Sequence, residues 1–253
     1  MLVAGCLAIA VLFAVGSRFA IRAALPESQR EGAHAVAAPL MSPLGAAFAI
    51  LAALSLANEA AYFNSAQQIV SSEAADSSRL AWAATMPGVQ TAPIHAALSS
   101  YLRATRTYEW HGSSAADGTD VATDHAAATL ERVVRSEAAR PALGTPSSTE
   151  LLASLDAITS DRRSRLAAAS REPPALYVIT LAVSGAALLA CASALTIRSA
   201  GRVAFLIGGL TIVVGLSMAL LFALGTPWRG PIVVSGHAID TVIRDLANGY
   251  FSS

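Results

Sequence analysis

The sequence contains no lysine and few charged residues of any kind. Charged residues make up 13% of the chain, whereas a soluble domain usually carries about 25%. Because 54% of the residues are hydrophobic, the polar side chains are too few to cover a water-soluble globule. The shortage of charge therefore argues against an ordinary soluble protein and favours a protein of the lipid bilayer.

An excess of charge of one sign is also missing, and cysteine is scarce. The 17 basic residues balance 17 acidic ones, while nucleic-acid binding would need a basic patch or stripe. We therefore expect no nucleic-acid partner. Cys6 and Cys191 lie in separate apolar runs without a CxxC motif, so we interpret them as small apolar residues and not as a disulfide framework.

Catalytic motifs are missing as well. The chain has no GxSxG elbow, no glycine-rich loop of Walker or Rossmann form and no HExxH motif. One group of carboxylates and imidazoles occurs at His111, Asp117, Asp120, Asp124 and His125. Its oxygen atoms could hold a hard cation, but acidic residues are also favoured near a helix N-terminus. We expect no enzyme activity, no cofactor and no metal.

Long apolar runs are the main feature that is present. Crossing a bilayer takes about 20 mostly apolar residues, and four runs meet this requirement at residues 2–20, 39–57, 175–196 and 203–224. Arginines stand at the end of the first run, at Arg18 and Arg22, and not before it, which favours a retained anchor over a cleaved signal peptide. We predict no ionisable residue inside the spans, which argues against a proton-coupled transporter.

Small and hydroxyl-bearing residues are frequent in the last two spans. Such residues allow transmembrane helices to pack closely. A pore lined by hydroxyls and backbone is the alternative interpretation. The residues concerned are Thr180, Ser184, Gly185, Ser193 and Thr196 in the third span and Gly208, Gly209 and Gly215 in the fourth.

The remaining sequence predicts an all-α protein with a helical, water-facing domain between two transmembrane pairs. The predicted divisions are residues 1–57, 58–174, 175–226 and 227–253, the last being an amphipathic helix. A linker is predicted at 23–38, followed by a helix start at Ser42-Pro43. Within the domain we expect helices near 93–110 and 120–140, and a third that begins at the capping-box sequence Ser147 to Glu150. The apolar residues of this third helix recur at helical spacing: Leu151, Leu152, Leu155, Ile158 and Leu166.

Two features bear on ion passage and on orientation. Asn58 and Glu59 lie at the end of the second span, where they can mark the water interface or, in a channel, tune ion access at the mouth of a pore. The positive-inside rule places arginine-rich short connections in the cytoplasm. The first and last connections carry Arg18, Arg22, Arg30, Arg198 and Arg202. Residues 58–174, on the opposite side of the membrane, would then lie outside. Arg162, Arg163, Arg165 and Arg171 favour the opposite orientation.

A series of short motifs in fixed order resembles a known family. From about residue 40 to its end the chain is similar to the bestrophin-like domain family of bacterial membrane proteins, whose function is unknown. The motifs are Ser72-Glu73-Ala74, Tyr101, Glu109-Trp110, Arg162-Arg163-Ser164-Arg165-Leu166 and Pro227-Trp228-Arg229-Gly230.

The resemblance implies more than the residues alone do. The family is named after bestrophins, which are pentameric, anion-selective channels with four spans and a helical cytosolic domain. The resemblance therefore implies that this chain forms a homo-oligomeric anion channel in a bacterial plasma membrane, with residues 58–174 in the cytosol. No pore constriction is matched here. The residues that match the family pattern, without a known role, are Glu73, Tyr101, Glu109, Trp110, Arg163 and Arg165.

Two interpretations remain open for the helical domain. The pattern residues can be structural, with Tyr101 and Trp110 packed between helices and Glu73 or Glu109 paired with an arginine of the 162–165 cluster, a pair that is costly to break on one side. The rival to a channel is a membrane-anchored interaction or scaffolding protein, whose helical domain binds a protein partner.

Overall fold

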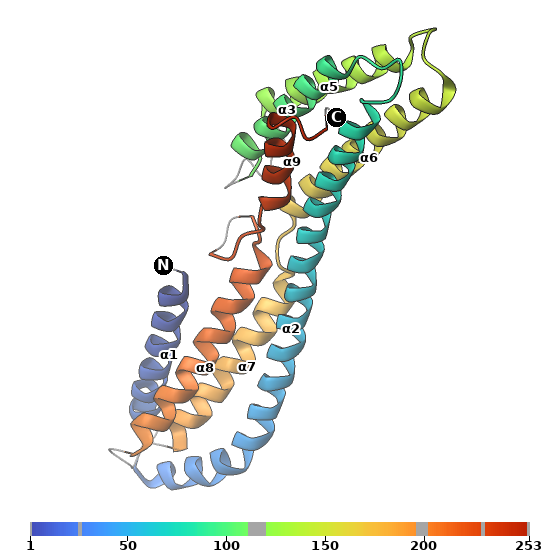
Figure 1. Cartoon of the computed structure of the whole chain (residues 1–253). Helices are drawn as coiled ribbons and strands as arrows, with labels where there is room; N and C mark the ends of the chain where they lie inside the picture. Colours follow the sequence, from blue (N-terminus) through green and yellow to red (C-terminus); the bar gives the residue numbers. More distant parts are fainter. Residues whose placement is uncertain (1, 25–26, 111–119, 196–201, 229–230, 252–253) are drawn as a thin grey trace. The chain divides into compact units, whose positions relative to one another are not determined.

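The computed structural model describes residues 2–24, 27–110, 120–195, 202–228 and 231–251. In these ranges the regular secondary structure is α-helical, which confirms the predicted fold class. The helices are α1 (Leu2–Ala24), α2 (Glu27–Ala83), α3 (Thr91–Tyr108), α5 (Val121–Ala138), α6 (Thr145–Ser170), α7 (Ala175–Leu195), α8 (Arg202–Gly225) and α9 (His237–Ala247) (Figure 1).

The chain forms two compact units. Unit 1 comprises Met1–Tyr62, Glu172–Gly225 and Gly230–Ile232. Unit 2 comprises Phe63–Arg171, Thr226–Arg229 and Val233–Ser253. Helix α9 belongs to unit 2, where it packs against α3.

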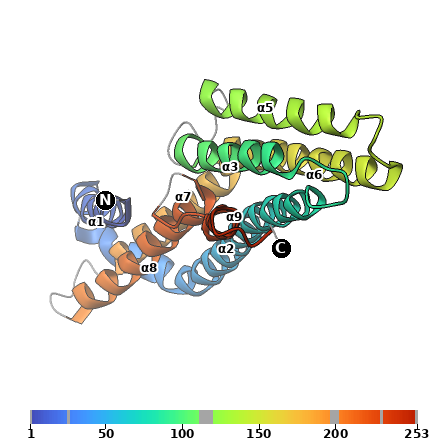
Figure 2. The same cartoon turned by 45° about the horizontal axis from the view of Figure 1, so that its top comes forward.

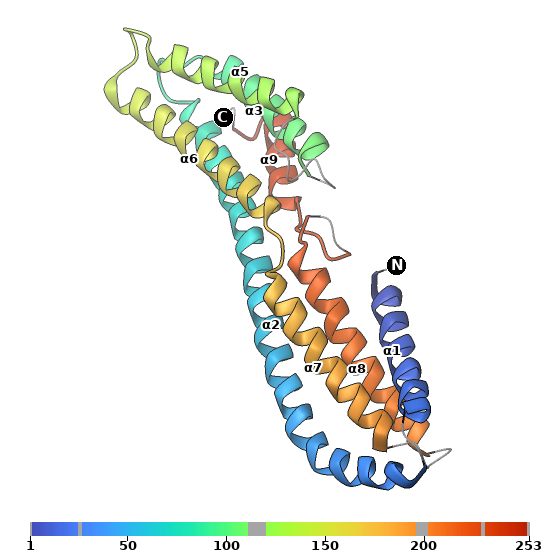
Figure 3. The same ribbon diagram turned by 180° about the vertical axis from the view of Figure 1, so that it is seen from behind.

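Unit 1 contains α1, the first part of α2, α7 and α8. Helix α1 contacts both α7 and α8, and these three helices run side by side (Figures 1 and 3). Phe48 and Ala52 of α2 share an apolar core with Leu181 and Leu188 of α7 and Val214 of α8. Within the described residues, four helices are long and apolar enough to cross a membrane, as expected of a multi-pass membrane protein.

The start of α2 differs from the prediction. The linker at residues 23–38 and the helix start at Ser42-Pro43 are wrong, because α1 continues to Ala24 and α2 begins at Glu27 with Pro39 and Pro43 inside it. An internal proline removes one hydrogen bond and crowds the preceding turn, and α2 curves in this part (Figure 3). In a bilayer no water replaces lost backbone hydrogen bonds, so the helix continues through the prolines.

Arg18 lies within the first candidate span. The candidate span covers Ala4–Ile21, so the expectation of spans free of ionisable residues is wrong at this position. At a rise of about 1.5 Å per residue, Arg18 lies roughly 9 Å before the C-terminal end of α1. It therefore belongs to the end of the span and not to its middle.

Two of the predicted packing glycines lie at close helix contacts. A Cβ atom on Gly185 would be 2.9 Å from Val214 Cγ1 and 3.3 Å from Phe48 Cε2. A Cβ on Gly215 would be 2.9 Å from Leu7 Cδ2 and 3.2 Å from Leu7 Cα. A larger residue at either position would force a neighbouring side chain to move, which confirms the packing interpretation for these two positions.

The other small residues give a mixed result. Ser193 Oγ lies 3.0 Å from Ser17 Oγ, so α7 and α1 share a hydrogen bond. A Cβ on Gly208 or Gly209 would meet no atom within 4 Å, so the packing prediction is wrong for both within this chain. The hydroxyls of Thr180 and Ser184 donate to carbonyls of their own helix, and Thr196 lies outside the described residues.

Unit 2 packs the second part of α2 with α3, α5, α6 and α9. Helix α3 contacts α5 and α9, while α5 contacts α6 (Figure 2). Of the apolar positions predicted for α6, Leu151, Leu155 and Ile158 are buried, Leu166 is partly buried and Leu152 is exposed. Other buried members of this core are Leu80, Ile94, Leu98, Leu102, Leu130, Val134 and Ile239.

Of the four described helices that begin in unit 2 (α3, α5, α6 and α9), α5 is the one whose start has a side-chain cap. Asp120 caps α5, and its Oδ1 accepts from the Thr123 backbone N at 2.9 Å. The capping box predicted at Ser147 is wrong, because α6 already begins at Thr145 after Gly144, with a proline in its first turn. Glu150 instead accepts hydrogen bonds from Arg79 at 2.5 and 3.0 Å.

Candidate functional site

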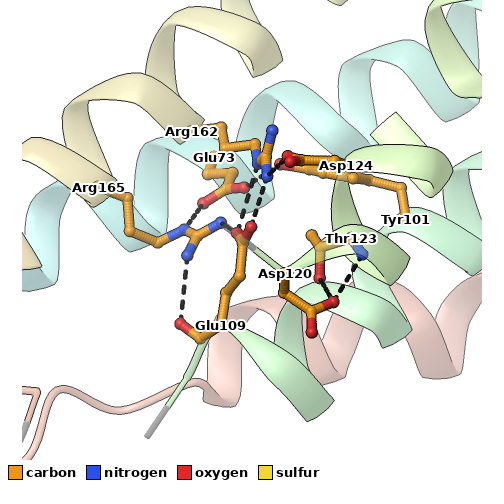
Figure 4. Close-up of polar contacts among 8 residues, drawn as sticks. All are labelled: Glu73, Tyr101, Glu109, Asp120, Thr123, Asp124, Arg162 and Arg165. Carbon is orange, nitrogen blue, oxygen red and sulfur yellow. Dashed lines mark hydrogen bonds and ion pairs between the residues drawn. The ribbon is translucent and has the colours of Figure 1, made fainter. Parts of the chain in front are cut away.

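Arg165 is the centre of a buried ionic network in unit 2 (Figure 4). It comes from α6, and its side chain has no exposed surface. Its Nε donates to Glu73 Oε2 of α2 at 2.7 Å, and its Nη2 donates to Glu109 Oε2, at the end of α3, at 2.9 Å. Both carboxylate side chains are fully buried as well. One guanidinium group therefore ties three helices together.

Tyr101 and Arg162 complete the network. The Tyr101 hydroxyl donates to Glu73 Oε1 at 2.5 Å. Arg162 Nη2 donates to Glu109 Oε1 at 2.5 Å and to the half-exposed Asp124 at 2.7 Å. The two buried carboxylates thus face two guanidinium groups, so the buried charge is balanced.

The titration of Tyr101 fits this arrangement. Burial raises the pKa of its phenol well above the ordinary value of 10.0, and the neighbouring Glu73 carboxylate raises this pKa further. The phenol therefore stays protonated and remains a donor to Glu73. Buried ion pairs carry a desolvation cost, and removing one partner leaves an uncompensated charge.

Two tryptophans extend the site with aromatic contacts. Trp110, just after α3, packs edge-on against Trp228, with ring centroids 5.5 Å apart. The Arg106 guanidinium lies 4.5 Å from the centroid of a Trp110 ring, within cation–π range. Arg106 also donates to both carboxylate oxygens of Asp240 in α9, at 2.6 and 2.9 Å. Helix α9 is thereby joined to the end of α3.

The structure brings together most of the pattern residues. Glu73, Tyr101, Glu109 and Arg165 are hydrogen-bonded. This confirms that a glutamate pairs with the arginine cluster, and both glutamates do so where the prediction named one or the other. Tyr101 and Trp110 are buried between helices as the structural interpretation predicts: their side chains are 1% and 2% exposed.

Arg163 is the charged pattern residue that the network does not include. It is exposed, and Arg162 makes the contacts instead. Residues three apart share one face of a helix, so Arg162 and Arg165 point the same way while Arg163 points elsewhere. The helical spacing of the RRSR sequence was the signal that could have identified Arg162.

Sequence reasoning also missed the roles of Arg106 and Trp228. Arg106 precedes Trp110 by four residues, the spacing that places side chains on one helical face. The contact between Trp110 and Trp228 joins segments far apart in the chain, and no local signal predicts it.

The candidate metal group is not supported within the described residues. Among them, no group of three His, Cys, Asp or Glu side chains could hold a metal ion. Asp120 caps α5 and Asp124 pairs with Arg162. His111 and Asp117 lie outside the described residues.

Asn58 and Glu59 belong to unit 1 and take no part in this network. Asn58 is exposed, and its Nδ2 donates to Tyr177 Oη at 3.1 Å. Glu59 is only 1% exposed. Its Oε2 would be 3.2 Å from a Cβ on Gly225, so the carboxylate lies at the end of α8.

The contacts of the unit 2 network hold helices together and indicate a structural role. Its charged groups are saturated by one another, and it holds no cysteine or serine nucleophile. A cavity of about 360 Å³ borders it, lined by Tyr101, Asp124, Arg162 and Arg163 among others. The arrangement fixes the positions of α2, α3 and α6 without offering a reactive group.

Comparisons with known proteins agree with this fold. The chain shares 11% identity and a TM-score of 0.74 with a crystal structure of a membrane protein, over 97% of both chains. It shares 11% identity and a TM-score of 0.67 with a mutant bacterial bestrophin homolog from Klebsiella pneumoniae, over 98% of this chain and 97% of that one. No curated protein matches. A family model for the Bestrophin-like domain matches residues 8–239, and the chain therefore belongs to this family.

Proposed function

We propose that the chain assembles into a homo-oligomeric ion channel of the plasma membrane and that this channel conducts anions. The observation that carries the proposal is the likeness in fold to a bacterial bestrophin homolog over 97% of that chain. Membership of the Bestrophin-like family supports the same conclusion. A shared fold does not fix a function, so ion flux has to be measured directly.

The charge content of the membrane helices also favours passive conduction. Arg18 and Glu59 are the only formally charged side chains in residues 4–21, 35–59, 175–195 and 207–225, which are the described apolar parts. Each of the two lies near an end of its apolar segment. Coupled transporters and pumps use carboxylates or histidines in the membrane interior, and these segments have none at mid-depth.

Asn58 and Glu59 are the proposed contributors to ion access. Glu59 is buried, so it would act on a passing ion through its field and not by contact. A negative charge at the mouth of a pore disfavours anions. Neutralising Glu59 is therefore expected to increase anion flux.

The test is a flux assay with the full chain in liposomes that enclose a chloride-sensitive dye. We expect chloride flux above that of empty liposomes, and higher flux for Glu59→Gln. Glu172→Gln is the matched control, because it removes the same charge from an exposed position of unit 1. Native mass spectrometry of the same sample should give the mass of a homo-oligomer.

Two results would contradict parts of the proposal. Folded protein that passes no chloride would rule out an anion channel, and retrieval of a stable protein partner would then favour the interaction role. Equal flux from wild type and Glu59→Gln would remove only the role assigned to Glu59.

A further inference from the structure

An apolar groove runs between α1 and α8 in unit 1. Its cavity volume is about 550 Å³, and side chains from both helices line it. Gly208 forms part of the wall, where a Cβ atom would meet nothing within 4 Å. Gly208 is therefore not needed for close helix packing, and the empty space beside it can hold a bound molecule. The principal lining side chains are Val11, Val15, Phe19, Ile207 and Ile212.

Among the side chains that the structure describes, Arg18 is the one charged side chain that lines this groove. Its Nε is buried and has no hydrogen-bond acceptor among the described residues. A guanidinium group is always protonated and needs an anion or several acceptors when it leaves water. The groove thus combines an apolar wall with a guanidinium group whose Nε has no acceptor among the described residues.

The position of Arg18 selects the kind of anion. It lies three residues from the end of the candidate span Ala4–Ile21, which corresponds to about 4.5 Å along the helix axis. Val11 lies roughly 10 Å deeper by the same rise. A ligand that fits must therefore carry its negative charge near the membrane surface and an apolar part below it.

We propose that this groove binds one anionic phospholipid, with the phosphate accepting hydrogen bonds from Arg18. One acyl chain lies along Val11, Val15 and Ile212, past Gly208. Exposed neighbours such as Leu12 and Val213 are apolar, as expected of a surface in contact with lipid. Basic residues near the membrane surface attract anionic lipids, and Arg18 is such a residue.

An anionic lipid is favoured over a zwitterionic one because of charge. A zwitterionic headgroup carries its own cation, which competes with Arg18 for the phosphate. A lipid with net negative charge leaves the Arg18 guanidinium as the partner of the phosphate. This proposal does not depend on channel activity.

The test measures lipid retention by the purified full chain with native mass spectrometry. The protein is exposed in detergent to phosphatidylglycerol or to phosphatidylcholine, and the bound lipid is counted. We expect one retained phosphatidylglycerol, and retention weaker by about tenfold or more for Arg18→Gln, because a charge-assisted hydrogen bond is lost. Arg103→Gln, at an exposed position of unit 2, should leave retention unchanged.

A second pair of variants tests the groove without touching the charge. Gly208→Leu fills the groove and should release the lipid, whereas Gly209→Leu should not, because Gly209 does not line it. Both positions are open within the chain, so both variants should fold.

Three results would overturn the proposal. The first is equal retention of the two lipids by wild type. The second is unchanged retention in both Arg18→Gln and Gly208→Leu. The third is a Gly208→Leu protein that keeps its lipid but loses its oligomeric mass, since the groove would then be a contact between subunits.

Discussion

The two units of this chain hold their helices together by different means. In unit 1, glycines allow close approach, as at Gly185 and Gly215. In unit 2, the helices are joined by buried charges around Arg165. The difference follows from the surroundings: lipid is as apolar as leucine, so membrane helices gain from fit and not from the hydrophobic effect. A water-facing unit can bury apolar side chains for stability and can add a balanced ionic network for geometry.

The chain carries separate native reporters for the two units. Its three tryptophans, Trp82, Trp110 and Trp228, lie in unit 2, and its two cysteines, Cys6 and Cys191, lie in unit 1. Tryptophan emission therefore follows unit 2 during heating. The rate of maleimide labelling follows unit 1.

The largest expected effect comes from breaking the ionic network. Arg165→Met leaves Glu73 and Glu109 buried without this partner, and we expect unit 2 to lose about 3–5 kcal/mol of unfolding free energy. Thermal unfolding in detergent, followed by tryptophan emission, measures the change. The transition followed by cysteine labelling should shift less.

Arg163→Met is the matched control for this variant. It removes the same type of side chain from an exposed position two residues away, and surface substitutions usually change stability by no more than about 0.5 kcal/mol. Similar shifts in the two variants would mean that the network does not stabilise unit 2.

A smaller effect, with a pH signature, is expected at Tyr101. Tyr101→Phe removes the hydrogen bond to Glu73, and a bond to a charged group contributes about 1.5–3 kcal/mol. Burial raises the pKa of Tyr101 above its ordinary value of 10.0. The contribution of the Tyr101 phenol to the unfolding free energy is therefore complete below about pH 10, the pKa of an unfolded tyrosine. This contribution declines as the pH rises toward the pKa of Tyr101 in the folded protein.

The measurement is the difference in tryptophan-monitored stability between wild type and Tyr101→Phe at pH 8 and near pH 11. The difference should be smaller at the higher pH. Other titrating groups are common to both proteins and cancel. A difference that does not change with pH would show that the phenol is not held as a neutral donor in the folded state.

The smallest effect is expected in unit 1. Gly215→Ala places a methyl group against Leu7 of α1, and overpacking of this kind typically costs about 1–3 kcal/mol, with one methyl at the lower end. Gly209→Ala in the same helix meets no neighbour within 4 Å. Cysteine labelling should therefore start at lower temperature in Gly215→Ala only. Identical profiles would argue against close packing at Gly215.

Much of the architecture could be predicted from local sequence. The apolar runs gave the four membrane helices, and the spacing of Leu151, Leu155 and Ile158 gave the buried face of α6. The pairing of Glu73 or Glu109 with the arginine cluster was predictable too, because buried charges need partners, but the structure decided that both take part. Proline misled the prediction at the start of α2, since its local preference is outweighed where the backbone has no water to bond.

The sequence by itself thus determined that this chain spans a membrane, that it is helical and that its acidic and basic pattern residues pair. These properties depend on composition and on spacing along one helix. Only the tertiary structure decided that Arg162 and not Arg163 joins the network, that Trp110 meets Trp228 and that Arg18 lines an open groove. Those outcomes depend on how each helix is rotated against its neighbours, and that rotation is set by the packing of all the helices together.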